Sequence, residues 1–246
     1  MSAKKTFKIL MVESDPFIGV NLKKGLENLG HSVTLDSGEI ASWKRMFTKC
    51  YGNDDFDIVH IHSPNMKKVG CCWKYLKGDT KLVCHWHGSD LRHPSKSFPV
   101  LRLMKRWGDL HLFSTIDLQW WLRDVKNSSL FVCPVDTEMF KPDESIEKID
   151  EVLKWGMGLL HWGCEFEQEF FIEHDCVPKF LNNYRKVLCT PEDGLSPFLI
   201  SVSALEAASC GLEVVHHPYM TREWILKNAS IESQSTLLDS LYRHLC

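Results

Sequence analysis

The chain has 246 residues, of which 44% are apolar and 25% are charged, and its formal net charge is −3. This composition is typical of a globular protein with a buried core, and the small negative charge gives no reason to expect nucleic acid as a partner. The opening residues, MSAKKTFKILMV, are basic and then apolar only for the length of a strand. We therefore expect no signal peptide, no membrane span and a cytoplasmic location.

The ten cysteines follow no metal-binding or disulfide pattern. They are scattered, mostly in apolar runs such as LVCH and LFVC, and no pair has the CxxC spacing of a structural zinc site. Buried free thiols are the favoured interpretation. Disulfides of the kind found in thermophilic proteins are the alternative.

Short apolar runs alternate with longer helical or turn-like segments up to about residue 140. The runs are FKILMV, HSVTLD, DIVHIH, KLVCHW, LHLFST and LFVCPV. This alternation predicts βαβ units and a parallel sheet. In the first intervening segment, Ile18, Leu22, Leu26 and Leu29 recur at helical spacing and Gly30 follows, which predicts an amphipathic helix that ends there.

The segment FKPDESIEKIDE, residues 140–151, is charged and turn-prone, and it predicts a boundary between domains 1–140 and 141–246. After it, MGLLHW, KVLCTP and LEVVHH are candidate strands. A helix is expected over 203–209 and a final amphipathic helix near STLLDSLYRHL. Fewer strand and helix pairs fit here, so we expect a second, smaller α/β lobe.

The opening KILMVESDPFIGVNLKKGLENLGHSV also resembles a phosphorylation-dependent receiver domain, in which Glu13 and Asp15 would hold Mg²⁺. A receiver carries its phosphorylated aspartate at the end of the third strand, where this chain has His62. An imidazole cannot form the acyl phosphate that this switch uses, and LHLFSTIDL lacks the expected lysine. We therefore exclude a receiver.

Four later stretches share a different pattern with the same opening. They are DIVHIHSPN, LVCHWHGSDLR, FSTIDLQWWL with CPVDTEMFKP, and LEAASCGLEVV. Together, over roughly residues 7–217, they resemble the GT-B glycosyltransferases of the large, metal-independent retaining family that contains sucrose synthase and bacterial mannosyltransferases. The resemblance implies an α/β fold of two Rossmann-like lobes with parallel sheets, here with the second lobe reduced.

The resemblance also implies a function. The chain would move a sugar, as a hexosyltransferase, from a nucleotide-sugar donor to a hydroxyl acceptor with retention and without a metal cofactor. The acceptor would be a glycan, a lipid or a small molecule. Donors in such folds bind between the lobes, beyond the carboxyl ends of the strands, where helix N-termini can hold phosphate.

In the first half, His87 directly precedes Gly88 after a predicted strand. The resemblance places it near the reacting sugar, and it is the candidate catalytic residue. Asp90 would support the same loop, and Gly19 would let the backbone approach the donor phosphates at the start of the first helix. Packing of the histidine and a plain helix-start glycine are the alternatives.

In the second half, the resemblance makes Glu206 the ribose ligand and puts Ser203 near the phosphates, at the start of a helix. The alternative is a helix that merely packs. The family has a second glutamate eight residues earlier, where this chain has Phe198; Ser196, Glu192 and Asp193 are candidate substitutes.

The family also has an arginine and a lysine after the first strand of its second domain, and WGMGLLHWGCEFEQEFF contains no such pair. Lys154, Arg185 and Lys186 lie elsewhere. This departure motivates a second hypothesis, a non-catalytic nucleotide-sugar or glycan-binding protein on the same fold.

A third hypothesis is a metal-dependent hydrolase. His60 and His62, like His85 and His87, are spaced so that each pair shares one face of its predicted strand. If the strands are neighbours, the four imidazoles converge, and neutral imidazole is a common metal ligand. No acidic ligand has a matching spacing, so the transferase interpretation, without a metal site, is preferred.

The segment HPSKSFPVLRLMKRWG is basic and amphipathic. Such a segment suits weak peripheral contact with an anionic membrane, although a solvated helix face is the favoured interpretation.

Overall fold

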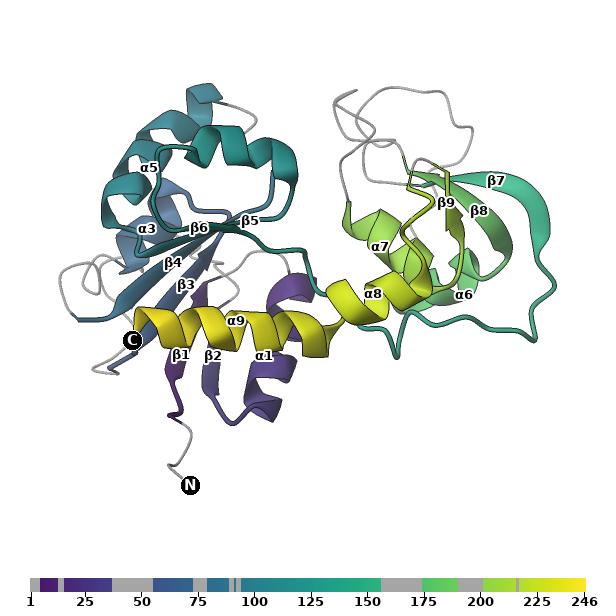
Figure 1. Ribbon diagram of the computed structural model, residues 1–246, viewed down its shortest axis with the longest axis horizontal. Helices are drawn as coiled ribbons and strands as arrows, with labels where there is room; N and C mark the ends of the chain where they lie inside the picture. Colours follow the sequence, from purple (N-terminus) through teal and green to yellow (C-terminus); the bar gives the residue numbers. More distant parts are fainter. Residues whose placement is uncertain are drawn as a thin grey trace. The chain divides into compact units, whose positions relative to one another are not determined.

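The computed structural model describes residues 5–12, 16–36, 55–72, 79–88, 91, 94–155, 174–189, 201–215 and 217–246. The chain divides into two compact units: Met1–Val132 with Gln234–Cys246, and Cys133–Ser233 (Figure 1). Over the described ranges, no helix is both long and apolar enough to cross a membrane.

A six-stranded parallel sheet forms the first unit, in the order β2-β1-β3-β4-β5-β6 (Figure 1). Its strands are Lys8–Val12 (β1), Ser32–Asp36 (β2), Ile58–His62 (β3), Lys81–Trp86 (β4), Leu110–Phe113 (β5) and Ser128–Leu130 (β6). The strand order reverses between β1 and β3. Ligands of open parallel sheets bind beyond the carboxyl ends of the strands at such a reversal.

The helices between these strands include Pro16–Asn28 (α1), Met66–Cys72 (α3), Pro94–Trp107 (α5) and the 3-10 helix Ile116–Leu122 (η2). The C-terminal helix Ile231–Leu245 (α9) also belongs mainly to this unit. The first helix ends where the sequence predicts, because Gly30 adopts a φ of 92°, a conformation that costs glycine little.

The two faces of the sheet differ in chemistry because successive side chains of a strand point to opposite faces. On one face, apolar side chains from β1, β3, β4 and β5 pack with α5 and η2 in a single core. The other face presents polar imidazoles from β3 and β4, and α9 packs over it (Figure 1).

Two buried hydrogen bonds hold α9 to the first unit. Nε2 of His31 lies 3.0 Å from Oδ1 of Asp239, and Nδ1 of His60 lies 2.7 Å from the hydroxyl of Tyr242. The structure therefore differs from the expected division after residue 140, since the C-terminal helix packs against the first sheet.

The second unit contains a three-stranded parallel sheet in the order β7-β8-β9. Its elements are Ile149–Trp155 (β7), the 3-10 helix His174–Cys176 (η4), Val177–Leu181 (α6), Tyr184–Cys189 (β8), Val202–Ser209 (α7), Glu213–Val214 (β9) and Arg222–Asn228 (α8). The predicted strand MGLLHW lies outside the described residues. The predicted α/β class, with two parallel sheets of which the second is smaller, is confirmed.

The segment 140–151 does not separate the two units. Residues from Ile149 onward begin β7, and the second unit already starts at Cys133. Val135 forms a parallel bridge with Ser230, with its N–H 2.8 Å from the carbonyl oxygen of Ala229. Because of these contacts, residues 133–139, which precede the charged segment, belong to the second unit.

Candidate functional site

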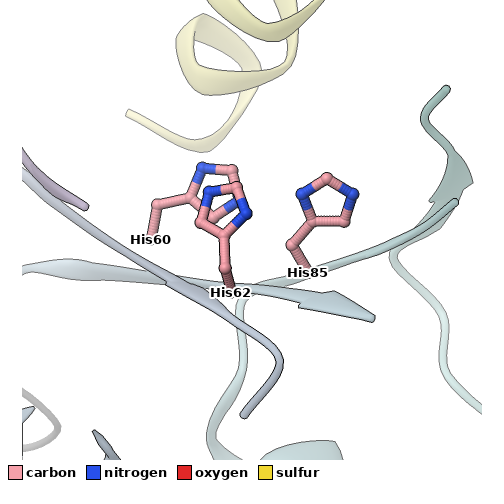
Figure 2. A group of neighbouring side chains, drawn as sticks. All are labelled: His60, His62 and His85. Carbon is pink, nitrogen blue, oxygen red and sulfur yellow. The ribbon is translucent and has the colours of Figure 1, made fainter. Parts of the chain in front are cut away.

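Four histidines gather near the carboxyl ends of β3 and β4. His60 and His62 share one face of β3, and His85 of β4 is the register partner of His62. His87 follows β4 directly. Figure 2 shows His60, His62 and His85 projecting from the strands towards the same side. The two HxH pairs therefore converge, as the sequence predicts for neighbouring strands.

A chain of hydrogen bonds runs through this group. Nδ1 of His62 lies 3.0 Å from Nε2 of His87, whose Nδ1 lies 3.1 Å from the hydroxyl of Ser114. The same hydroxyl lies 3.0 Å from Nε2 of His85. His87, the predicted catalytic residue, thus has protein partners at both ring nitrogens.

Burial keeps these imidazoles neutral. It lowers the pKa of His60 and of His87 to about 3, with smaller effects from the charge of His87 on His60 and of Lys68 on His87. The pKa values of His62 and His85 are also well below the ordinary value, again mainly because of burial. At neutral pH each ring therefore offers one donor and one acceptor.

The loops that follow the two strands are tied to this group. Ser63 adopts a φ of 45° and Gly88 a φ of 135°, so the chain leaves both strands through unusual backbone conformations. The N–H of Ser63 donates to the carbonyl oxygen of His85 over 2.8 Å. The ammonium of buried Lys68 donates to the carbonyl oxygen of His62 over 2.5 Å. The rim of the site is thereby fixed by backbone contacts.

Gly19 is buried in the first turn of α1, which follows β1. This position agrees with the expected helix start, and α1 begins beside the β1/β3 reversal where ligands of such sheets bind. Asp90, Ser196, Glu192 and Asp193 lie outside the described residues.

The second unit presents the start of α7 beyond the carboxyl end of β8. Ser201 caps this helix, since its side chain accepts a hydrogen bond from the N–H of Ala204 over 3.1 Å. Ser203 and Glu206 are partly buried, and their spacing of three puts them on one face of the helix. The N–H groups of Val202 and Ser203 have no acceptor within the helix and are therefore suited to an anion.

The carboxylate of Glu206 acts on two nearby thiols. Burial and, secondarily, the charge of Glu206 raise the pKa of Cys189 to about 12 and that of Cys210 to about 12. Cys189 ends β8. The charge of Glu206 therefore acts on the last residue of β8 and on the residue that follows α7.

The two cations of β8 do not lie at this edge. Arg185 and Lys186 are near the amino end of the strand and form exposed ion pairs with Asp150 and Glu213, with N–O distances of 3.0 Å and 3.1 Å. They do not replace the missing arginine and lysine of the family pattern.

Four residues of the two sites were missed by the sequence analysis: Ser114, Tyr242, Lys68 and Ser201. Ser114 and Ser201 have the signals of a strand end and a helix cap, respectively. Tyr242 follows Leu238 at helical spacing in the final helix, which predicts burial of one face but not the strand that it meets. Lys68 carries no distinguishing signal.

Comparison with known proteins supports the fold but does not place the chain in a sequence family. No protein-family model matches the chain, and neither does any curated protein. Among solved structures, the chain is similar over nearly its whole length to a protein with bound ligands. That protein is Anabaena Alr3699/HepE, crystallised in complex with UDP and glucose.

The similarity to Alr3699/HepE has a TM-score of 0.54 at 12% sequence identity, over 97% of this chain and 97% of that chain. At this identity the likeness establishes the fold alone. Because it spans both chains almost completely, it covers the first sheet and the smaller second sheet together.

Proposed function

We propose that this protein is a glycosyltransferase that moves a hexosyl group from a nucleotide-sugar to a hydroxyl acceptor with retention. The observation that carries the proposal is the full-length fold similarity to a chain crystallised with UDP and glucose. UDP-glucose is therefore the first donor to test. Because one fold can host many activities, the proposal also requires a suitable site.

The second unit supplies the features that a nucleoside diphosphate needs. The capped start of α7 provides backbone N–H donors and the positive end of a helix dipole for phosphate. Glu206, one turn further, provides a carboxylate that accepts hydrogen bonds from ribose hydroxyls. Ser203 lies between them on the phosphate side.

The first unit supplies the sugar contact. His87 is neutral and partly buried at the carboxyl end of β4. In our proposal a sugar hydroxyl competes with Ser114 for Nδ1 of His87, while His62 continues to hold Nε2. A neutral ring in this position orients the sugar without carrying charge.

Transfer by this chain does not require a metal in our proposal, since helix N–H groups hold the diphosphate. The missing arginine and lysine leave less positive charge to stabilise the departing nucleotide. We therefore expect turnover to be slow compared with binding.

Calorimetric titration with UDP, GDP, ADP and their common sugar conjugates tests donor binding. Glu206→Ala should lower the affinity for the preferred nucleotide at least tenfold, which corresponds to about 1.4 kcal/mol of binding free energy. Glu213→Ala is the matched control, because it removes an exposed glutamate of the same unit that pairs with Lys186. Equal affinity in both variants would contradict the assignment of Glu206.

Turnover is measured as release of the nucleotide from its sugar conjugate, with and without a panel of hydroxyl acceptors. His87→Gln should abolish transfer while leaving nucleotide affinity within about twofold, because His87 belongs to the sugar site. Binding without turnover in the wild type would favour the non-catalytic alternative, and absence of nucleotide binding would remove the proposal.

A further inference from the structure

His60, His62 and His85 form a group whose geometry suits a metal ion. Their side chains are fully buried on one face of two adjacent strands, and each ring offers a nitrogen within 4.8 Å of the others (Figure 2). Three histidines are a known ligand set for zinc, and imidazole suits several first-row transition metals.

Two nitrogens in this group are buried and unsatisfied. Within the part of the chain that the structure describes, Nε2 of His60 and Nδ1 of His85 have no hydrogen-bond partner. A buried polar atom without a partner costs about 1–3 kcal/mol, so each such atom in a folded protein calls for an explanation. A shared ligand bound by both nitrogens would remove both costs.

The opposite nitrogen of every ring is held by a different group. Nδ1 of His60 meets Tyr242, Nδ1 of His62 meets His87, and Nε2 of His85 meets Ser114. Metal-binding histidines usually have their second nitrogen fixed in this way, which sets the tautomer and the ring orientation.

An ion at the centre gives one consistent set of proton positions. His60 then donates from Nδ1 to Tyr242, and His62 donates from Nδ1 to Nε2 of His87. His87 and His85 both donate to the hydroxyl of Ser114, which has two lone pairs to accept them. No ring has to donate and accept at the same nitrogen.

We propose that His60, His62 and His85 bind a divalent transition-metal ion, with Zn²⁺ best suited to three neutral imidazoles. The role is structural, because the ligands are buried and the ion would link β3 and β4 beneath α9. This proposal is independent of the proposed sugar transfer, for which we expect no metal.

The site must tolerate positive charge. Ligand nitrogens around tetrahedral zinc are about 3.4 Å apart, a spacing compatible with ring nitrogens that lie within 4.8 Å of one another. No carboxylate joins this group among the described residues, and the nearby ammonium of Lys68 opposes a second cation. Removing that charge by Lys68→Met should therefore raise zinc affinity.

Equilibrium dialysis of the full chain against buffered Zn²⁺, after stripping with a chelator, tests the proposal. We expect one zinc per chain, a higher Tm with zinc, and visible absorption typical of tetrahedral Co²⁺ when Co²⁺ replaces it. Failure of the wild type to bind either ion would overturn the proposal and would favour a buried water between the rings.

Two ligand variants and a matched control locate the ion. His60→Gln and His85→Gln should each lower zinc affinity at least tenfold, whereas His111→Gln should leave it unchanged, because His111 is buried on the other face of the sheet. Zinc bound equally by all three variants would place the metal elsewhere and contradict the assignment.

Tyr242→Phe provides a test that keeps all three ligands and most of the packing. Loss of the acceptor for Nδ1 of His60 should weaken zinc binding about tenfold. Nucleotide binding should not change in this variant, which separates the fate of this proposal from that of the transferase. Unchanged zinc affinity would be evidence against the arrangement described above.

Discussion

The two units bury polar groups in opposite ways. Among the described residues of the first unit, several buried polar side chains are histidines, and three of them, His60, His85 and His111, keep a ring nitrogen without a hydrogen-bond partner. In the second unit, buried Asn182 and Ser209 bond to main-chain carbonyls, and the described residues contribute no unsatisfied buried side-chain atom.

Arg222 shows what the polar groups of the second unit do. Its guanidinium donates to the carbonyl oxygens of Phe140 over 2.9 Å, Ser209 over 2.5 Å and Thr137 over 3.2 Å. These carbonyls belong to residues outside the sheet. The Arg222 side chain supplies hydrogen-bond donors to them in place of a neighbouring strand. Hydrogen-bonded groups of this kind hold the second unit together, whereas the unsatisfied nitrogens of His60 and His85, which lie in one cluster of the first unit, point to a ligand.

The largest effect is expected from removing the three hydrogen bonds that the Arg222 guanidinium donates to main-chain carbonyls, which we call the Arg222 clamp. Arg222→Leu should lower the free energy of unfolding by about 4 kcal/mol, because three carbonyls lose a charged donor. Urea denaturation measures the loss. Arg185→Leu is the control, since its ion pair with Asp150 is exposed and should contribute less than about 0.5 kcal/mol. Similar losses of unfolding free energy in both variants would show that the Arg222 clamp stabilises the fold no more than an exposed ion pair does.

The second prediction concerns a histidine of the first unit outside the proposed metal site. Burial, and secondarily the charge of Lys105, lowers the pKa of His111 from 6.5 to about 4, and its Nδ1 accepts a hydrogen bond from Trp86 over 3.1 Å. Between pH 6.5 and pH 4 the unfolded chain binds a proton that the folded chain does not. His111 should therefore contribute a fall of about 3 kcal/mol in the free energy of unfolding as the pH falls through this window, in addition to the effect of the other buried histidines.

The contribution of His111 is isolated by comparing the wild type with His111→Gln, which does not titrate but keeps an acceptor for Trp86. Urea denaturation from pH 7.5 to pH 4 should show a shallower pH dependence in the variant, by up to one proton. Parallel curves would mean that His111 is protonated in the folded chain.

The third prediction tests how tightly the same ring is enclosed. A Cβ at Gly108 would lie 2.6 Å from Nε2 of His111 and 3.0 Å from the carbonyl oxygen of Met104. Gly108→Ala should therefore cost about 2 kcal/mol. Introducing it into a His111→Ala background should cost less, because the ring is then absent, and a double-mutant cycle measures the difference. Strict additivity would contradict this packing.

The same comparison explains what the sequence predicts well. The strands β1 to β5 coincide with the predicted apolar runs to within about two residues, because alternating apolar and helical segments are a local property. The run LFVCPV was wrong as a strand: β6 is Ser128–Leu130, and only Leu130 belongs to the run. The N–H of Phe131 still donates to the carbonyl oxygen of Phe113 in β5 over 2.9 Å, and its ring is buried edge-on against His85, with ring centroids 5.2 Å apart, so the apolar run reports burial beyond the last strand residue.

Long-range partners could not be predicted. The amphipathic pattern of the final helix predicts a buried face, but nothing local shows that Tyr242 meets a histidine 182 positions earlier or that Asp239 meets one 208 positions earlier. The predicted domain boundary differs from the structure for this reason. The HxH spacing did predict shared faces, but the nitrogen partners that distinguish a metal site from packing depend on α9 and Ser114.

The smallest expected effect separates structural from functional capping in the second unit. Ser201 caps α7 and Thr221 caps α8, each by accepting a hydrogen bond from a backbone N–H, of Ala204 and Trp224 respectively. Ser201→Ala and Thr221→Ala should each cost about 1 kcal/mol of stability. Only Ser201→Ala should also weaken nucleotide binding in calorimetric titration, because α7 is the proposed phosphate site. A matching loss of affinity in Thr221→Ala would mean that general destabilisation, and not the start of α7, governs binding.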